Sequence, residues 1–234
     1  DLHGNASSAA DFSLTANNSI RQAVGSQVQS GGVFALQSSQ GNITLAGKNQ
    51  ATGDISLLAR QGNVTTQAGV DGQAGSQSLT GTVTVTAQTA NLGGVLRADG
   101  GALSITADTI DLQGDLQSKT DTRLIAQNRL QQRQTSNLLA EGEVSMQVAQ
   151  GNLSLAGQTQ ASHDIDLQAT QGSIQLDGAV QTLQGDLTIQ ARGDVSQNPC
   201  AASATPTTCN SKLLVDQGVL AIQSRQGNLD LGYL

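Results

Sequence analysis

Apolar residues recur two positions apart in short runs along the whole chain, and a glycine or an aspartate usually stands just before each run. This alternation predicts short β-strands that bury one face. The clearest series of such runs consists of Phe12/Leu14, Phe34/Leu36, Ile55/Leu57, Val83/Val85, Leu103/Ile105, Leu124/Ala126, Val144/Met146, Ile165/Leu167, Leu187/Ile189 and Leu220/Ile222.

Two further series lie between the members of the first. The second consists of Ile20, Ile43/Leu45, Val64, Leu92, Ile110/Leu112, Leu130, Leu153/Leu155, Ile174/Leu176, Val195 and Leu229/Leu231. The third is weaker and consists of Val28, Ala51, Leu96, Leu116, Leu138, Ala161, Val180 and Leu214. The first two series lengthen at the same two places, which predicts insertions near residues 70–78 and 198–210.

Members of one series return about every 21 residues, and such a period with two or three short strands per unit is typical of a solenoid. A unit of this kind buries its apolar side only when neighbouring units stack on it. We therefore predict an all-β fold, a single parallel β-helix of about ten coils across residues 1–234. The stretch from Asp121 to Glu143 has no glycine before Gly142, but Leu124 and Leu130 stay in step, so we interpret it as irregular coils and not as a helix.

The tripeptide Gln-Gly-Asn marks the same point of several coils. It occurs at residues 40–42, 61–63, 150–152 and 226–228, and Gln-Gly-Ser occurs at 171–173. We predict that each glycine takes a positive φ at a corner, and that the residue after it stacks in a side-chain ladder with its equivalents. The predicted corner and ladder residues are Gly41, Asn42, Gly62, Asn63, Gly151, Asn152, Gly172, Ser173, Gly227 and Asn228.

The composition fits a thin, elongated core, because aromatic residues make up 1% of the chain and hydrophobic residues 37%. The net charge is −7 and no basic stripe is present, which argues against nucleic-acid binding. No apolar run approaches 18 residues, so we expect no membrane insertion.

Cys200 and Cys209 are the two cysteines of the chain, and both prolines lie in or beside the same short stretch. Two cysteines without histidine neighbours do not make a zinc site. We predict a disulfide that closes a surface loop, which favours an oxidising compartment; the alternative is two free thiols in a polar loop.

The outward positions of the first two series argue against catalysis. Aspartates on them stand between small neutral residues, whereas paired acid–base chemistry needs two carboxylates within about 10 Å. We therefore predict no enzyme activity, no cofactor and no metal. His163, in His-Asp-Ile-Asp, occupies the slot that Gly53 and Gly185 hold elsewhere, so we interpret it as a turn residue.

Two short motifs have both a functional and a structural interpretation. Arg192-Gly193-Asp194 spells a sequence that some adhesins present to integrins, but Gly193-Asp194 is also the usual unit of turn followed by strand. Sequons for N-glycosylation begin at Asn5, Asn17, Asn42, Asn63 and Asn152. The pattern Asn-apolar-Thr is, however, also the one expected where a turn is followed by a strand.

The segments GNLSLAGQTQASHDIDLQA (Gly151–Ala169) and GDLTIQARGDVS (Gly185–Ser196) resemble filamentous-haemagglutinin repeats. Such repeats belong to exoproteins of two-partner secretion systems, which include filamentous adhesins and contact-dependent growth-inhibition proteins of the CdiA type. The resemblance extends over nearly the whole chain. It implies a right-handed β-helix shaft that is exported through a dedicated outer-membrane transporter.

The chain departs from these exoproteins in two motifs. Asn-Pro occurs once, at Asn198-Pro199 inside an insertion, whereas the secretion domain of the family carries motifs such as Asn-Pro-Asn-Gly; a VENN-like motif is also missing. We therefore expect an internal segment of a longer protein.

The expected function is that of a structural and adhesive shaft, secreted to the surface of a Gram-negative cell, that extends a binding or toxin-delivery region. The expected partners are the outer-membrane two-partner-secretion transporter, through another part of the protein, and a receptor on a host or neighbouring cell. One alternative is a receptor-binding segment that acts through the insertions. The other is a carbohydrate-active β-helix enzyme.

Overall fold

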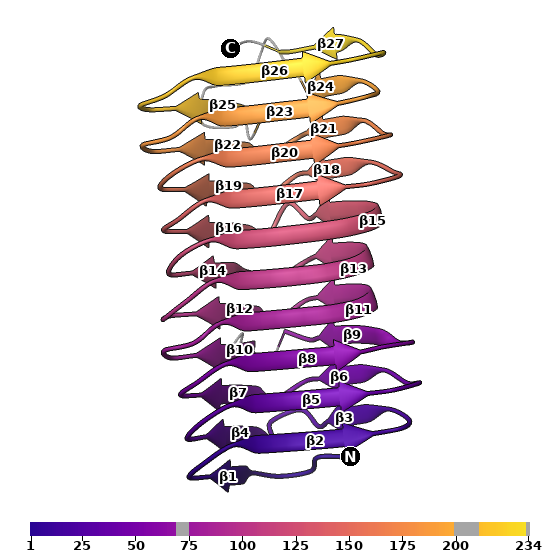
Figure 1. Ribbon diagram of the computed structural model, residues 1–234, viewed down its shortest axis with the longest axis vertical. Coiled ribbons are helices and arrows are strands. Elements are labelled where there is room, and N and C mark those ends of the chain that lie inside the picture. The colour runs from indigo at the N-terminus through magenta and orange to yellow at the C-terminus, as the bar shows by residue number, and fades with distance from the viewer. Residues whose placement is uncertain (69–74, 199–210, 233–234) are drawn as a thin grey trace.

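A computed structural model describes residues 1–68, 75–198 and 211–232 of the chain. Within these residues every regular element is a β-strand, and the strands wind into a parallel solenoid of about nine turns (Figure 1). The strands nearest the viewer in Figure 1 run from left to right while the chain climbs, which is the right-handed sense. The predicted fold class is confirmed.

The solenoid has three faces, each with ten stacked strands. The first face contains β2 (Phe12–Ala16), β5 (Phe34–Ser38), β8 (Ile55–Ala59), β11 (Val83–Leu92), β13 (Leu103–Leu112), β15 (Thr122–Gln132), β17 (Val144–Val148), β20 (Ile165–Ala169), β23 (Leu187–Ala191) and β26 (Leu220–Ser224). The second face contains β3 (Ile20–Gln22), β6 (Ile43–Leu45), β9 (Asn63–Thr66), the later halves of β11, β13 and β15, β18 (Leu153–Leu155), β21 (Ile174–Leu176), β24 (Val195–Gln197) and β27 (Leu229–Asp230).

The third face is a separate ten-stranded sheet. It contains β1 (Ala6–Ser8), β4 (Gln27–Ser30), β7 (Lys48–Ala51), β10 (Gly75–Ser78), β12 (Val95–Ala98), β14 (Leu116–Ser118), β16 (Asn137–Ala140), β19 (Gln158–Ala161), β22 (Ala179–Thr182) and β25 (Lys212–Val215). All strand pairs on the three faces are parallel, as the sequence period predicts.

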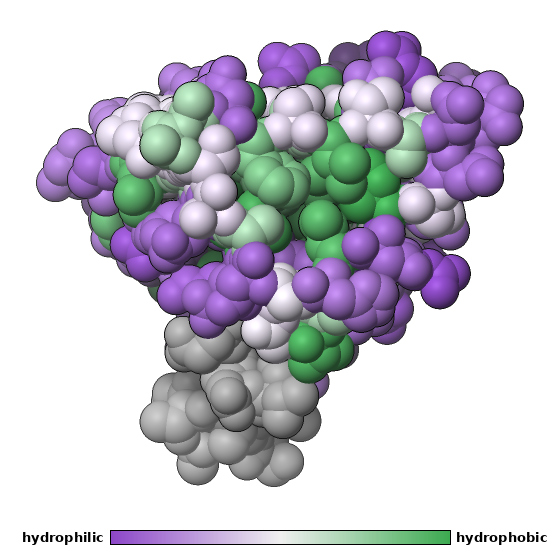
Figure 2. All heavy atoms as spheres, turned by 90° about the horizontal axis from the view of Figure 1, so that it is seen from below, coloured by the Kyte–Doolittle hydropathy of each residue, from purple (hydrophilic) through white to green (hydrophobic). Residues whose placement is uncertain are grey.

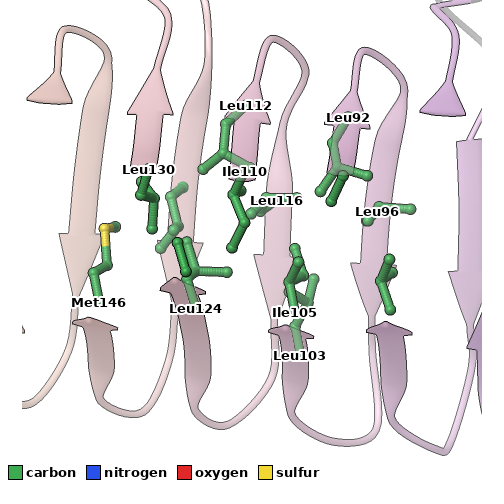
Figure 3. Packing of buried hydrophobic residues seen from close by; sticks show 14 of the residues in the cluster. Leu92, Leu96, Leu103, Ile105, Ile110, Leu112, Leu116, Leu124, Leu130 and Met146 are labelled. Atoms are coloured by element: carbon green, nitrogen blue, oxygen red, sulfur yellow. The ribbon is translucent and has the colours of Figure 1, made fainter. Parts of the chain in front are cut away.

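Every second side chain of a strand points inward and stacks on its equivalents one coil away. Figure 3 shows this packing in the middle of the rod, where Leu103, Ile105, Leu124 and Met146 lie in the same interior. The last inward position of each third-face strand usually holds a small residue. Ala51, Ser78 and Ala98 are examples, and they pair with one another on successive coils. Branched side chains therefore fill the wide part of the interior, and small ones fill the corner after the third face.

The sequence alignment of the coils was wrong by two residues at several positions. Leu124 pairs with Ile105 and not with Leu103, whose partner is the buried Thr122. Leu92 pairs with Thr66, and Val64 pairs with Ala90. In the third series Ala51 and Ala161 lie one inward position later than assigned. Near the end of the chain the shift is by one residue, because the inward Val180 pairs with Leu213 and not with Leu214. A shift by two keeps the alternation of inward and outward residues, so the sequence pattern does not reveal it.

Three coils in the middle of the rod lack the corner between the first and second faces. β11, β13 and β15 run without a break through both faces, and β11 pairs with β8 and β9 at once. None of these three coils contains Gln-Gly-Asn, and none has a glycine between the two faces. The segment from Asp121 to Glu143 contains β15 and β16, so the choice of strands over a helix is confirmed.

Both predicted insertions lie between a second-face strand and a third-face strand. The step from Val64 to Ser76 is 12 residues, and that from Val195 to Leu213 is 18, where the regular step from Ile43 to Asn49 is 6. Gly75–Ser78 form the regular strand β10, so the additional residues of the first insertion precede Gly75. The predicted Cys200–Cys209 disulfide lies outside the described residues.

Apolar side chains are partly exposed at the two ends of the rod. Figure 2 looks along the rod from the end that carries β1 and shows apolar residues in the middle with polar residues around them. Leu2, Phe12 and Leu14 are only partly buried there, and Leu220 and Ile222 are only partly buried at the other end. The interior of the solenoid is therefore continuous from one end to the other.

Candidate functional site

The Gln-Gly-Asn corners stack on one another along one edge of the rod, as predicted. The backbone N–H of Asn63 donates to Oδ1 of Asn42 on the preceding coil at 2.9 Å. The N–H of Ser173 donates in the same way to Asn152 Oδ1, also at 2.9 Å. Equivalent residues on successive coils are thus near neighbours. The ladder differs from the predicted one because the side-chain oxygen accepts a backbone N–H, and the side-chain amides do not bond to each other.

The predicted positive φ at these corners is wrong. Among the described residues only Gly4, Gly25 and Gly218 have a positive φ. A Cβ on Gly62 would lie 2.1 Å from the carbonyl oxygen of Gly41, and one on Gly172 would lie 2.0 Å from that of Gly151. Glycine is needed here because the preceding coil lies too close for any side chain, and not because of the backbone conformation.

Arg192-Gly193-Asp194 belongs to the same corner column. Asp194 donates its N–H to Ser173 Oγ at 3.0 Å, and its Oδ1 accepts the N–H of Asn228 at 2.7 Å. A Cβ on Gly227 would lie 2.4 Å from the carbonyl carbon of Gly193. The last two residues of the tripeptide therefore have the same structural role as Gly-Asn in other coils, and recognition by an integrin remains a prediction.

Three of the five sequon asparagines act as hydrogen-bond acceptors for the next coil. Asn5 Oδ1 accepts the N–H of Gln27 at 3.0 Å, in the same manner as Asn42 and Asn152. This bond uses Oδ1, whereas an N-linked sugar would be attached to Nδ2. The structural role of these asparagines and their glycosylation are therefore compatible, and glycosylation remains a prediction.

A second corner, before the first face, carries carboxylates on successive coils, which the sequence argument missed. Asp121, Glu143, Asp164 and Asp186 follow one another here, because Asp121 Oδ1 accepts the N–H of Glu143 at 2.9 Å and Asp164 Oδ1 that of Asp186 at 2.7 Å. The outward face positions, from which no enzyme activity was predicted, do not include this corner. The signal was present, because these acids are spaced by 22, 21 and 22 residues.

These carboxylates act as caps for the backbone of the next coil. Asp11, Asp54 and Asp186 use Oδ1 in the same way, for the N–H groups of Val33, Thr82 and Val219. Within residues 1–68, 75–198 and 211–232, no group of three or more His, Cys, Asp or Glu side chains could hold a metal ion. His163 lies in this corner, where a Cβ on Gly185 would lie 2.5 Å from its carbonyl carbon, as expected for a turn residue.

Two outward aspartates on the faces have shifted pKa values for opposite reasons. Asp111 is buried and accepts two hydrogen bonds of 2.9 Å from Nε and Nη2 of Arg133. The Arg133 hydrogen bonds lower the pKa of Asp111 against the opposing effect of burial. Partial burial between Ser145 and Thr188 raises the pKa of Asp166. Asp111 therefore belongs to an ion pair across successive coils, which the sequence did not predict.

The interior also contains polar side chains that bond only to one another. Gln22 and Asn49 exchange two hydrogen bonds of 3.0 Å between their side-chain amides, and Asn49 donates a third, of 3.3 Å, to Ser76 Oγ. All three residues are buried. In the sequence they occupy inward positions of their series, but they do not stand out because glutamine and serine are also the usual outward residues.

No family model, no curated protein and no solved structure matches the chain. The described part of the chain contains no helix long and apolar enough to cross a membrane. The geometry of the rod therefore carries the functional argument.

Proposed function

We propose that the chain is a shaft segment of a large secreted Gram-negative surface exoprotein, in which it holds a binding or toxin-delivery region away from the cell. The resemblance to filamentous-haemagglutinin repeats supports the secretion route through an outer-membrane transporter. The observation that carries the proposal is the unbroken ladder of ten parallel strands on the third face.

The ladder favours a mechanical role, because successive coils are hydrogen-bonded to one another along all three faces and at the corners. A rod of this kind resists bending, since any bend must open backbone hydrogen bonds on one side. Its outward first face presents short side chains such as Ser13, Ser56, Thr84 and Ser104 in one column. Such a surface offers little for specific recognition and suits a spacer.

A deletion that preserves the register tests this proposal in the complete protein that contains the segment. Removal of residues 144–186 joins Glu143 to Leu187 and removes two coils, because Val144, Ile165 and Leu187 are equivalent. The rod becomes shorter by about 9.6 Å. We expect normal display on the cell surface and retained recognition of the target cell.

The control deletes residues 144–176, which breaks the register, and should abolish display. The proposal is wrong if the in-register deletion is displayed at the normal level but no longer recognises its target. In that case the deleted coils themselves would form the binding region.

The second candidate function is receptor binding through the insertions. The observation that favours it is that both insertions stand at the same point of a coil in the chain, between β9 and β10 and between β24 and β25. Loops on a rigid scaffold carry binding more often than the scaffold itself.

Removal of residues 69–74 and 199–210 tests the second candidate. It restores the regular step of 6 residues between the second-face and third-face positions, as from Ile174 to Val180. We therefore expect the trimmed rod to fold with unchanged stability. Retained attachment to target cells would exclude the insertions as the receptor-binding element, whereas its loss in a folded protein would support them.

A further inference from the structure

Two arginines occupy equivalent positions on successive coils near the β27 end of the rod. Arg192 and Arg225 directly follow the last residues of β23 and β26 on the first face. Their N–H groups bond to carbonyl oxygens of the coil below, Arg192 to Ala169 at 3.1 Å and Arg225 to Ala191 at 3.0 Å. Their backbones are thus held one strand spacing apart, which is about 4.8 Å.

The two arginines border a small hollow that is also lined by Gln168, Thr170 and Gln190. The side chains of these three residues make no hydrogen bond to the described part of the chain, so their amide and hydroxyl groups can donate to a ligand. No carboxylate lines the hollow. The nearby Asp194 uses Oδ1 to accept the N–H of Asn228 at 2.7 Å.

Neither guanidinium forms an ion pair with a carboxylate in the part of the chain that the structure describes. The ion pairs of the described residues involve Arg97, Lys119 and Arg133. Arg192 donates Nε to Gln226 Oε1 at 2.7 Å, while the side chain of Arg225 has no hydrogen-bond partner among the described residues.

Two cations held side by side on successive coils repel each other. An anion between them turns this repulsion into two attractions, and guanidinium groups match the oxygens of carboxylate, sulfate and phosphate groups. We propose that Arg192 and Arg225, with Gln168, Thr170 and Gln190, form a binding site for one oxyanion group.

Titration with small anions tests the site on the chain as it exists. Sodium acetate, sulfate and phosphate are added in turn at constant ionic strength against chloride, and the Nε–Hε signals of the arginines are followed by NMR. We expect the signals of Arg192 and Arg225 to shift and to saturate at millimolar concentration with at least one anion. Comparison of the three anions identifies whether the site prefers a carboxylate, a sulfate or a phosphate.

Arg60 provides the matched control, because it follows the last residue of β8 at the equivalent position and its N–H bonds to Ser38 O at 3.0 Å. R192Q and R225Q should each weaken binding at least tenfold, whereas R60Q should leave it unchanged, with the thermal unfolding of each variant recorded as a check of folding. The proposal is overturned if no anion saturates the signals, or if R60Q weakens binding as much as R192Q.

Discussion

At the scale of the residue, the corners are built from glycine and from one short side chain that accepts a backbone N–H of the next coil. The return of Gln-Gly-Asn was enough to predict that these residues are structural and that Asn42 and Asn63 are neighbours. It could not give the reason for the glycine. A sequence shows that a Cβ is excluded, but not whether the backbone conformation or a neighbouring coil excludes it.

The close approach of coils predicts a large cost for Gly62→Ala. A Cβ at this position would lie 2.1 Å from Gly41 O, so the backbone must shift. We expect a loss of about 2 kcal/mol or more in the free energy of unfolding, measured by urea denaturation. Gly53→Ala is the control, because its nearest neighbour would lie at 3.2 Å, and should cost less than about 1 kcal/mol. Equal effects of the two substitutions would contradict this explanation of the corner.

The ion pair of Asp111 and Arg133 predicts a loss of stability at acidic pH. Because the pKa of Asp111 is lowered in the folded state, the contribution is fully present above the pKa of the unfolded chain, about 3.9. It is lost as the pH falls below that value and through the lower pKa of the folded state. R133Q should therefore destabilise the protein at pH 7, and progressively less below pH 4.

R97Q serves as the control for R133Q, because the pair of Arg97 and Asp99 is more exposed to solvent. It should change the stability by less than about 0.5 kcal/mol at pH 7. Thermal unfolding from pH 2 to pH 7 measures both variants. A difference between R133Q and the unsubstituted protein that stays constant down to pH 2 would exclude the ion pair as its cause.

At the scale of the element, each strand is short and gains its stability from the strands above and below it. The sequence predicted which segments form strands, because period-two alternation survives in nearly every coil. It did not give the register at Thr122 and Ala90, where a small or polar residue occupies a core position that a larger apolar residue fills in other coils. The buried bonds between Gln22 and Asn49 were missed for the same reason.

The buried amide pair predicts that Asn49→Ala is costly and that a double substitution is not. Asn49→Ala leaves the buried amide of Gln22 without its partner, so we expect a loss of about 2–3 kcal/mol in the free energy of unfolding. Gln22→Leu combined with Asn49→Val replaces both amides by the residue types of neighbouring coils, Leu45 and Val28, and should restore most of the stability. Urea denaturation of both variants measures the difference, and a double variant no more stable than Asn49→Ala would contradict it.

At the scale of the whole molecule, one repeated unit is enough to specify a rod. The period of about 21 residues predicted the solenoid, and the two places where it lengthens predicted the insertions. The pair of faces between which the insertions stand could not be predicted, because the third series is the weakest and was misaligned at Ala51 and Leu214. The hollow beside Arg192 and Arg225 was also missed, since it forms only when coils are stacked in the correct register.

The central claim is that these coils form one stiff rod, and a distance measured between its two ends tests it most directly. Ser13 and Ala221 are outward residues of one column, nine strand spacings apart along the first face. Spin labels are attached to unnatural amino acids at these two positions, so that Cys200 and Cys209 are not labelled. Double electron–electron resonance should give a single narrow distribution at about 43 Å, apart from the length of the labels. A broad distribution, or one centred far from this value, would contradict the account.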